Sequence, residues 1–330
     1  MAGSEEFTRQ TDPFRRELLA HCYRMLGSVH DAEDLVQETF LRAWRAYDRF
    51  DDRRASMRTW LYRIATNACL TALEQGARRP MPSSLVGPAE DPEAPLASGP
   101  PEVAWLQPIP DALLEGGSSD PAAIVALRGS VRLALVAALQ HLPARQRAVL
   151  ILRDVLAWRA AEVAEVLDTT TTAVNSTLQR ARAQLAQVAP EEDEVAEPGD
   201  AGQRELLDRY VAAFETGDHA ALLRLLTDDV VVEMPPYLTW LEGRDRFARF
   251  LAPRLPPGGD PWRMVPTGAN GQLAVAGYRL RADGVHHAHS VQVLTVRGSR
   301  ISRIVAFQDP DLFATFGLPL VQPAAAARRR

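Results

Sequence analysis

A run of uncharged polar residues near the middle of the 330-residue chain has the chemistry needed to read DNA bases. Its side chains are those of Thr171, Thr172, Asn175, Ser176 and Gln179. Hydroxyl and amide groups donate and accept hydrogen bonds at base edges in the major groove, and Arg180 and Arg182, which follow, suit phosphates. We interpret this run as a DNA-reading surface. A solvated helical hairpin that binds nothing is the alternative.

A second group of residues mixes phosphate binders, stacking rings and base-edge donors. Arg53 and Arg54 lie in a loop, and the segment that follows carries Arg58, Tyr62, Arg63, Thr66 and Asn67. Arginine binds phosphate, aromatic rings stack on unpaired bases, and amides bond to base edges. This combination predicts another nucleic-acid surface.

Acidic residues cluster earlier in the chain, at Asp31, Glu33, Asp34 and Glu38. Negative side chains near a helix N-terminus are stabilised by the helix dipole, at roughly 0.3 to 1 kcal/mol each. From the residues alone, this structural role is the favoured interpretation.

The C-terminal third holds side chains that could act as acids or bases: Asp229, Glu233, His286, His287 and His289. Aromatic side chains that could line a pocket there are Tyr237, Trp240 and Trp262. Strand alternation puts His287 and His289 on one face and His286 on the other, so a third metal ligand is missing. We therefore expect a solvated hairpin end, with no catalytic residue, no metal and no cofactor.

Helices must position the first three groups. Apolar residues three and four apart predict helices over residues 14–26, 29–47 and 57–73, with Gly27 and Gly76 as ends and Ser28 as an N-cap. A short helix over 161–167, a turn at 168–170 and a helix over 174–185 predict a helix-turn-helix. Asp168 occupies the turn position where glycine adopts the left-handed conformation more easily.

Charge and composition divide the chain into domains. Residues 81–127 contain seven acids and no arginine, and residues 188–205 are also acidic and rich in proline, glycine and alanine. We expect a helical domain at 1–80, a linker at 81–127, a helix-turn-helix domain at 128–187, a linker at 188–202, an α+β domain at 203–320 and a tail at 321–330. Apolar residues at 103–106, 109 and 113–114 predict that part of the first linker docks onto a domain.

The α+β expectation rests on a change of pattern after residue 203. Helices are predicted over 206–214, 220–226 and 245–251, and strands over 230–234, 273–280, 289–296 and 301–307. The strands predict an antiparallel sheet. The fold class is thus multidomain, with two all-α domains followed by an α+β domain.

Several classes of protein are excluded by composition. Hydrophobic residues make up 46% and charged residues 24% of the chain, without an apolar run long enough for a membrane helix. Cys22 and Cys69 are the only cysteines, which excludes a disulfide scaffold and a zinc finger. We expect buried thiols, no secretory signal, no membrane partner and a cytoplasmic location.

The helical part resembles the extracytoplasmic-function sigma factors of bacterial RNA polymerase. The resemblance is carried by residues 24–44, 57–70, 142–150 and 173–182, which include Arg24-Met-Leu-Gly-Ser-Val-His-Asp-Ala-Glu-Asp and Met57-Arg-Thr-Trp-Leu-Tyr-Arg-Ile-Ala-Thr-Asn. It covers about half the chain. One departure is Thr177, at a position that is commonly arginine in that family.

The resemblance implies a role for each surface. The acidic helix would bind core RNA polymerase through Asp31, Asp34, Leu35, Gln37, Glu38, Phe40 and Trp44. The minus-ten element would be melted and held by Arg53, Arg54, Arg58, Trp60, Arg63 and Asn67. The helix-turn-helix would read the minus-thirty-five element of promoter DNA through Thr171, Thr172, Asn175, Ser176, Gln179, Arg180 and Arg182.

The C-terminal part resembles the SnoaL-like members of the cone-shaped NTF2-like superfold, through residues 215–218 and 225–235. Residues 105–110 and 309–312 resemble motifs of sigma factors that carry such a domain. A fold does not imply catalysis, so we expect a regulatory domain that contacts the sigma domains or the linker, and we do not expect an enzyme. The domain could also sense a small-molecule ligand. A conventional repressor, a stand-alone enzyme and a promoter-binding regulator fused to a small-molecule-binding or enzymatic domain are alternatives.

Both DNA modules are expected to be weak alone, because the helix-turn-helix domain carries only eight arginines against four acids. A polymerase that holds both modules would supply effective concentration in place of intrinsic affinity. The isolated protein is therefore expected to bind promoters poorly.

Overall fold

The computed structural model describes residues 2–76, 78–115, 121–188, 201–256 and 262–323. It divides into two compact units. The N-terminal unit comprises Met1–Pro80, Leu106–Ile109 and Leu113–Glu191, and the C-terminal unit comprises Met81–Trp105, Pro110–Ala112 and Glu192–Arg330. Residues 189–200 of the expected second linker and residues 324–330 of the expected tail lie outside the described residues.

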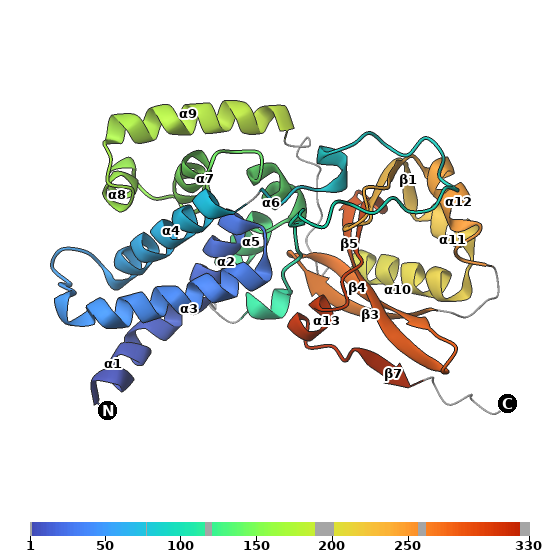
Figure 1. The fold of residues 1–330 in the computed structure, drawn as a ribbon, viewed down its shortest axis with the longest axis horizontal. Coiled ribbons are helices and arrows are strands. Elements are labelled where there is room, and N and C mark those ends of the chain that lie inside the picture. Colours follow the sequence, from blue (N-terminus) through green and yellow to red (C-terminus); the bar gives the residue numbers. More distant parts are fainter. Residues whose placement is uncertain (1, 77, 116–120, 189–200, 257–261, 324–330) are drawn as a thin grey trace. The chain divides into compact units, whose positions relative to one another are not determined.

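The N-terminal unit is helical (Figure 1). Its first group of helices is α1 (Ala2–Thr11), α2 (Arg15–Leu26), α3 (Val29–Ala46) and α4 (Met57–Gln75). Its second group is α5 (Pro121–Ser130), α6 (Leu133–Leu139), α7 (Ala144–Leu150), α8 (Ala160–Val166) and α9 (Thr171–Val188), with a π-helical turn at Ile151–Val155 after α7. Helix α4 joins the two groups, because it contacts α2 and α3 of the first and α7 and α8 of the second.

The helix boundaries follow the residues that begin and end them. Gly27 adopts a left-handed conformation with φ 70° and ends α2, and its N–H donates to the carbonyl of Tyr23. Ser28 then caps α3 by accepting a hydrogen bond from the N–H of Asp31. Asp168 has φ 49° between α8 and α9, as expected from its place in the turn. Helix α1 was not predicted.

Both cysteines are buried free thiols in the first helical group, as predicted. The thiol of Cys69 has a raised pKa, because Cys22 lies within hydrogen-bonding reach and because burial disfavours the thiolate. A thiol that stays protonated behaves as a small apolar side chain.

The C-terminal unit is an α+β fold, as predicted. Its helices are α10 (Ala201–Thr216), α11 (His219–Arg224), α12 (Arg244–Leu251) and α13 (Leu312–Thr315). Its strands are β1 (Leu226–Glu233), β2 (Trp240–Glu242), β3 (Trp262–Ala269), β4 (Gln272–Leu280), β5 (Val285–Arg297), β6 (Arg300–Phe307) and β7 (Val321–Pro323). Strands β2, β3 and β7 were not predicted.

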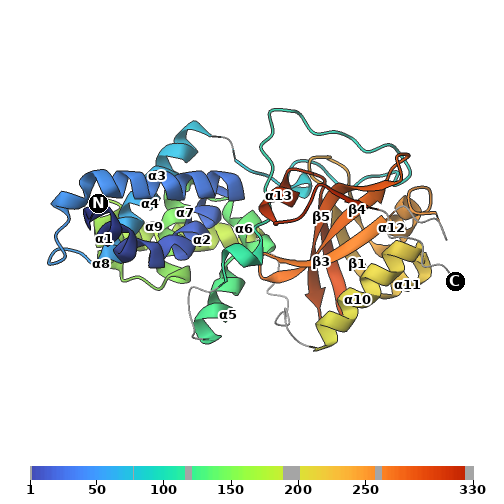
Figure 2. The same cartoon turned by 90° about the horizontal axis from the view of Figure 1, so that it is seen from below.

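The strands form one curved sheet in the order β2-β1-β6-β5-β4-β3, and β7 pairs with β5 (Figures 1 and 2). All neighbours are antiparallel except β1 and β6, which run parallel, so the sheet is mixed where a purely antiparallel sheet was expected. Helices α10, α11 and α12 pack against β1 and β3, and their apolar side chains close the core. The concave face of the sheet and these helices enclose a cavity.

Candidate nucleic-acid interface and C-terminal cavity

Helix α9 turns an apolar stripe inward and a polar row outward. Val174, Leu178 and Ala181 are buried. The polar row is exposed along the helix and consists of Thr171, Thr172, Asn175, Ser176 and Gln179. These short side chains, which carry no charge, have the hydrogen-bonding groups that a base edge requires.

The two arginines of α9 differ in their surroundings. Arg180 is exposed and donates a hydrogen bond to the hydroxyl of Thr177 at 3.3 Å. Arg182 is held by Asp154 through two hydrogen bonds of 2.7 and 2.8 Å. A phosphate at Arg182 would therefore have to compete with a carboxylate on the same domain.

The acidic face of α3 is only partly free. Asp31 is paired with Arg79, and Glu38 with Arg42 in the next turn. Asp34 and Gln37 are exposed, Leu35 and Phe40 are half-buried, and the guanidinium of Arg15 lies 4.7 Å from the centre of the Phe40 ring. Trp44 is 43% exposed, and so is its neighbour Leu41. Exposed large apolar side chains beside carboxylates are typical of a protein-binding surface.

The loop before α4 and the outer face of α4 carry the second predicted surface. Arg53, Arg54, Arg63 and Asn67 are exposed. Trp60 is half-buried and its ring lies 4.8 Å from that of Phe50. These side chains offer arginine, amide and aromatic groups on one stretch of chain.

Arg58 differs from its neighbours because its guanidinium already has partners within the protein. Its guanidinium is paired with Glu17 at 2.9 Å and lies over the rings of Tyr62 and Trp158. Burial acts against the charged form, but the hydrogen bond to Glu17 and the interactions with Tyr62 and with the charge of Glu17 together outweigh it and raise the pKa of Arg58. Trp158 belongs to the second helical group, so Arg58 and Trp158 lie at the contact between the two groups.

A further residue, Arg147, holds the groups together and was missed from the sequence. Arg147 on α7 is buried and donates to Oε1 of Gln140 at 2.7 Å and to the carbonyls of Leu142 and Met25. Burial lowers its pKa to about 10, so it remains charged at neutral pH. The signal in the sequence was an arginine directly before the apolar run Ala148–Leu152, which on its own does not reveal its partners.

The segment Leu106–Ile109 docks onto the N-terminal unit, as the apolar residues predicted. Leu106 and Ile109 are fully buried. The hydroxyl of Tyr23 donates to the carbonyl of Gln107 at 2.8 Å, and the hydroxyl of Ser28 donates to Oε1 of Gln107 at 2.7 Å. A Cβ on Gly27 would lie 2.7 Å from Leu106, so glycine is needed there for close approach as well as for its φ.

Residues 81–105, here called the linker segment, are part of the C-terminal unit and are hydrogen-bonded to its later residues. The composition of this stretch predicted a solvated linker, and this prediction was wrong. The N–H of Ser83 donates to Glu233 at 3.0 Å, and the ring N–H of Trp240 donates to the carbonyl of Val86 at 2.8 Å. Arg254 donates to the carbonyls of residues 92, 93 and 94. Hydrogen bonds from strands and helices far along the chain fix this acidic segment.

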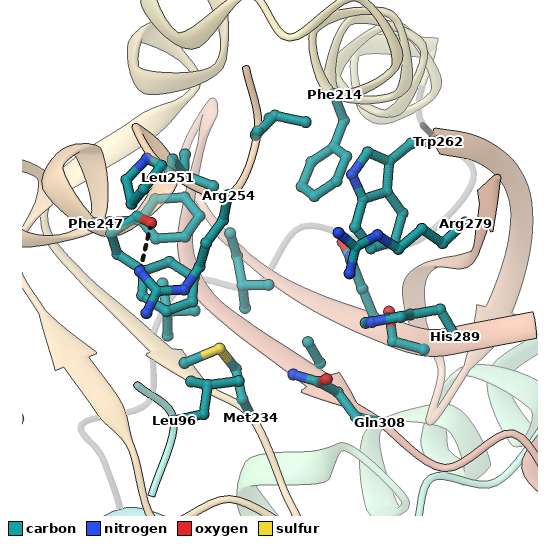
Figure 3. Close-up of a pocket in the computed structure, with 18 of the residues that line it drawn as sticks. Leu96, Phe214, Met234, Phe247, Leu251, Arg254, Trp262, Arg279, His289 and Gln308 are labelled. Carbon is teal, nitrogen blue, oxygen red and sulfur yellow. Dashed lines mark hydrogen bonds between the residues drawn. The ribbon is translucent and has the colours of Figure 1, made fainter. Parts of the chain in front are cut away.

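The C-terminal unit contains a cavity of about 540 Å³ between the sheet and helices α10 and α12 (Figure 3). Phe214, Phe247, Phe250 and Trp262 supply aromatic walls, and Leu96 of the linker segment also lines it. Of the three aromatic residues expected at a pocket, Trp262 is in place, but Tyr237 and Trp240 are not among its lining residues.

Two of the three histidines do not lie at a solvated hairpin end, whereas His287 is hydrogen-bonded to Asp283 of the exposed turn. His286 is buried and pairs with Gln322 of β7, and His289 lines the cavity with its ring 4.8 Å from that of Trp262. Burial, and then the charge of Arg279, lower the pKa of His289 to about 4. A β-bulge makes His289 an extra residue in β5, since Gly277 pairs with Ser290 and Tyr278 with Ala288. The bulge lets both His289 and Ser290 line the cavity.

Candidate acids of this unit are engaged in ion pairs. Asp229 is paired with Arg297, whose hydrogen bond lowers the pKa of Asp229 to about 2. Glu233 is fully buried and paired with Arg303. Among the described residues, no group of histidine, cysteine and carboxylate side chains could hold a metal ion. Nor does any helix in the described part of the chain have the length and hydropathy to cross a bilayer.

A helix-turn-helix with an exposed polar reading helix, joined to a second helical group that carries arginine and aromatic side chains, defines a two-module DNA-binding protein. Comparisons with known proteins agree. Residues 12–79 match the family model of sigma-70 region 2, residues 132–185 that of sigma-70 region 4, and residues 207–304 that of the SnoaL-like domain.

Relatives cover nearly the whole chain. The ECF RNA polymerase sigma factor SigG of Mycobacterium tuberculosis is 51% identical over 318 residues, which are 95% of this chain and 84% of SigG. SigJ of the same organism is 29% identical over 95% of both chains. The crystal structure of SigJ aligns with a TM-score of 0.60 at 27% identity, over 93% of this chain and 97% of SigJ.

The chain belongs to the ECF RNA polymerase sigma factors. It is accordingly a transcription initiation factor and not an enzyme of that process: its sigma-70 regions serve polymerase binding and promoter recognition, and a SnoaL-like domain follows them.

Proposed function

We propose that α9 reads the minus-thirty-five element, that α4 and its preceding loop melt and hold the minus-ten element, and that α3 binds core polymerase. The exposed row of Thr171, Thr172, Asn175, Ser176 and Gln179 on α9 carries the proposal. The exposed Arg53, Arg54, Arg63 and Asn67 support the second role, and the exposed Asp34, Gln37 and Trp44 support the third.

The contact between the two helical groups supports the dependence on polymerase. Elements centred near minus-ten and minus-thirty-five lie about 25 base pairs apart, or roughly 85 Å along B-DNA. Helix α4 contacts α7 and α8, and Arg58 lies over Trp158, so the two DNA-reading modules are packed together here. Packed in this way they cannot span such a distance, and polymerase would have to separate them.

Substitution of two base-reading residues tests the role of α9. In transcription with purified core polymerase, Asn175→Ala with Gln179→Ala should lower output from a cognate promoter about tenfold or more, since each base contact contributes about 1 to 3 kcal/mol. Gln187→Ala, an exposed residue at the far end of the same helix, is the matched control. Unchanged output from the double variant, with normal polymerase binding, would refute the assignment.

We further propose that the C-terminal unit controls activity through the linker segment. This segment is fixed by Glu233, Trp240 and Arg254 of the C-terminal unit, and the chain then continues into Leu106–Ile109, which is buried in the N-terminal unit. A change in the C-terminal unit can therefore reach the sigma regions through the chain itself.

Two altered proteins test this control. A chain that ends at residue 200 and the variant Arg254→Met both release the linker segment, and both should change promoter output in the same direction, by about fivefold or more for the truncation. Arg246→Met, on helix α12 shortly before Arg254 and with one long 3.4 Å hydrogen bond to the segment, is the control. Equal output from all four proteins would end the proposal of control.

A further inference from the structure

The cavity of the C-terminal unit has the size and lining of a small-molecule site. Its volume of about 540 Å³ is in the range of pockets that enclose ligands of some twenty heavy atoms. Aromatic rings supply much of the wall, as Figure 3 shows for Phe214, Phe247 and Trp262. An apolar aromatic body would bury its surface against these rings.

The charged side chains that line the cavity are both positive. Arg254 and Arg279 are its charged residues, and no aspartate or glutamate lies among the described residues that line the cavity. His289 adds no charge at neutral pH, because its pKa is about 4. Figure 3 shows Arg254 and Arg279 on opposite sides of the cavity. The cavity therefore favours a negative group.

The two arginines have different tasks. Arg254 donates to the linker carbonyls of residues 92–94 and to that of Phe250, so most of its donors are used. Arg279 lies 5.8 Å from the centre of the Trp262 ring, and within the described part of the chain it has no carboxylate partner. Arg279 is thus the cation that remains available to a ligand.

Polar atoms beside Arg279 also lack partners. The ring N–H of Trp262 and Nδ1 of His289 are buried, and neither has a hydrogen-bond partner among the described residues. By contrast, the hydroxyl of Tyr210 donates to Gln292 at 2.6 Å. The unsatisfied groups therefore gather at the end of the cavity that holds Arg279, where they can bind a polar ligand group.

We propose that this cavity binds an amphipathic aromatic anion. Its carboxylate or phenolate would lie at Arg279, Trp262 and His289, and its aromatic body between Phe214, Phe247 and Phe250. This proposal rests on the proposed control of activity by the C-terminal unit. Binding of the anion in the cavity would alter transcription through that control.

Occupancy would reach the linker segment by direct contact. Leu96 forms part of the cavity wall, and Arg254 links the wall to the carbonyls of residues 92–94. A ligand that displaces Leu96 or draws Arg254 inward changes the hydrogen bonding of the segment. Amide exchange of residues 88–98 reports this change.

Two dyes with one aromatic skeleton test the anion preference on the full-length protein. 8-Anilinonaphthalene-1-sulfonate carries a sulfonate, and N-phenyl-1-naphthylamine is the same skeleton without it. Arg279→Met should weaken sulfonate binding about tenfold, because a charge-assisted hydrogen bond is lost, and should leave the neutral dye unchanged. Arg281→Met, an exposed arginine that is not part of the lining, removes the same charge nearby and should weaken neither dye.

The possible outcomes distinguish the anion site from its role in the control of transcription. Equal sulfonate affinity in the wild type and in Arg279→Met, or equal losses in both arginine variants, would overturn the anion site. Sulfonate binding that depends on Arg279 and alters amide exchange at residues 88–98 supports it. The dye measurements need no polymerase, so an intact site with unaltered transcription would refute the control role while leaving the site in place.

Discussion

The two units of this sigma factor place their polar chemistry in opposite ways. In the N-terminal unit, α9 exposes its row of hydroxyl and amide groups, and its buried side is apolar. In the C-terminal unit, His289, Trp262 and Arg279 line a concave cavity. A convex helix suits a partner as large as DNA, whereas a concave sheet suits a ligand that it can enclose. The difference is consistent with the proposals that the first unit reads DNA and that the second unit binds a small molecule.

The units also differ in how they accommodate buried charge. Arg147 of the N-terminal unit is compensated by Gln140 and by backbone carbonyls. Glu233 of the C-terminal unit is compensated by Arg303 and by the N–H of Ser83, which is part of the linker segment. Charge compensation in the C-terminal unit is therefore coupled to the segment that continues into the sigma regions.

The largest expected effect comes from breaking the buried pair. Arg303→Met leaves the carboxylate of Glu233 buried with one backbone donor, and should lower the free energy of unfolding of the C-terminal unit by about 3 kcal/mol. Hydrogen exchange should show faster opening of β1 and β6, with α4 unchanged if the units unfold separately.

Arg244→Met is the control for that experiment. It breaks the pair with Asp228, whose side chain is 79% exposed, and exposed pairs contribute under about 1 kcal/mol. If the two variants opened β1 and β6 equally, the pair at Glu233 would be no stronger than a surface pair.

The sequence predicted the helical unit better than the sheet. Helices α2, α3, α4 and α9 follow from apolar spacing and from residues such as Gly27 and Ser28, which act locally. Strand β3 was missed because Pro266 and Gly268 interrupt its pattern, and the bulge at His289 in β5 was missed because strict alternation does not foresee an extra residue. Arg58 over Trp158 joins residues 100 positions apart, which no local pattern reveals.

The stability of the two units is expected to depend on pH in different ways. Burial, and then the charges of Arg24 and Arg58, lower the pKa of His21 in the folded N-terminal unit to about 3. The unfolded chain binds a proton near pH 6.5 and the folded state does not, so stability is lost as the pH falls below 6.5. Between pH 7.5 and 5 the loss should be about 2 kcal/mol.

Replacing histidine with glutamine tests which residue causes this loss of stability at low pH. His21→Gln, which retains a group able to bond to Thr66, should remove the pH dependence of unfolding for α2 and α4 only. His289→Gln should act on the C-terminal unit only, where the folded pKa is about 4. A wild-type slope that persists in His21→Gln would show that other groups titrate.

The smallest expected effect concerns left-handed backbone positions. In the described C-terminal unit most such positions are glycines, among them Gly271, Gly284 and Gly298, and Asn270 at φ 58° is the exception; around α8 they are occupied by Ala157 at φ 55° and Asp168 at φ 49°. A left-handed residue other than glycine costs about 1 to 2 kcal/mol, and glycine loses about 0.5 to 1 kcal/mol more in conformational entropy on folding. Ala157→Gly should therefore stabilise the N-terminal unit by about 0.5 kcal/mol in urea unfolding. Asp168→Gly should gain less, because aspartate tolerates this conformation, and a larger gain at Asp168 than at Ala157 would contradict this ordering.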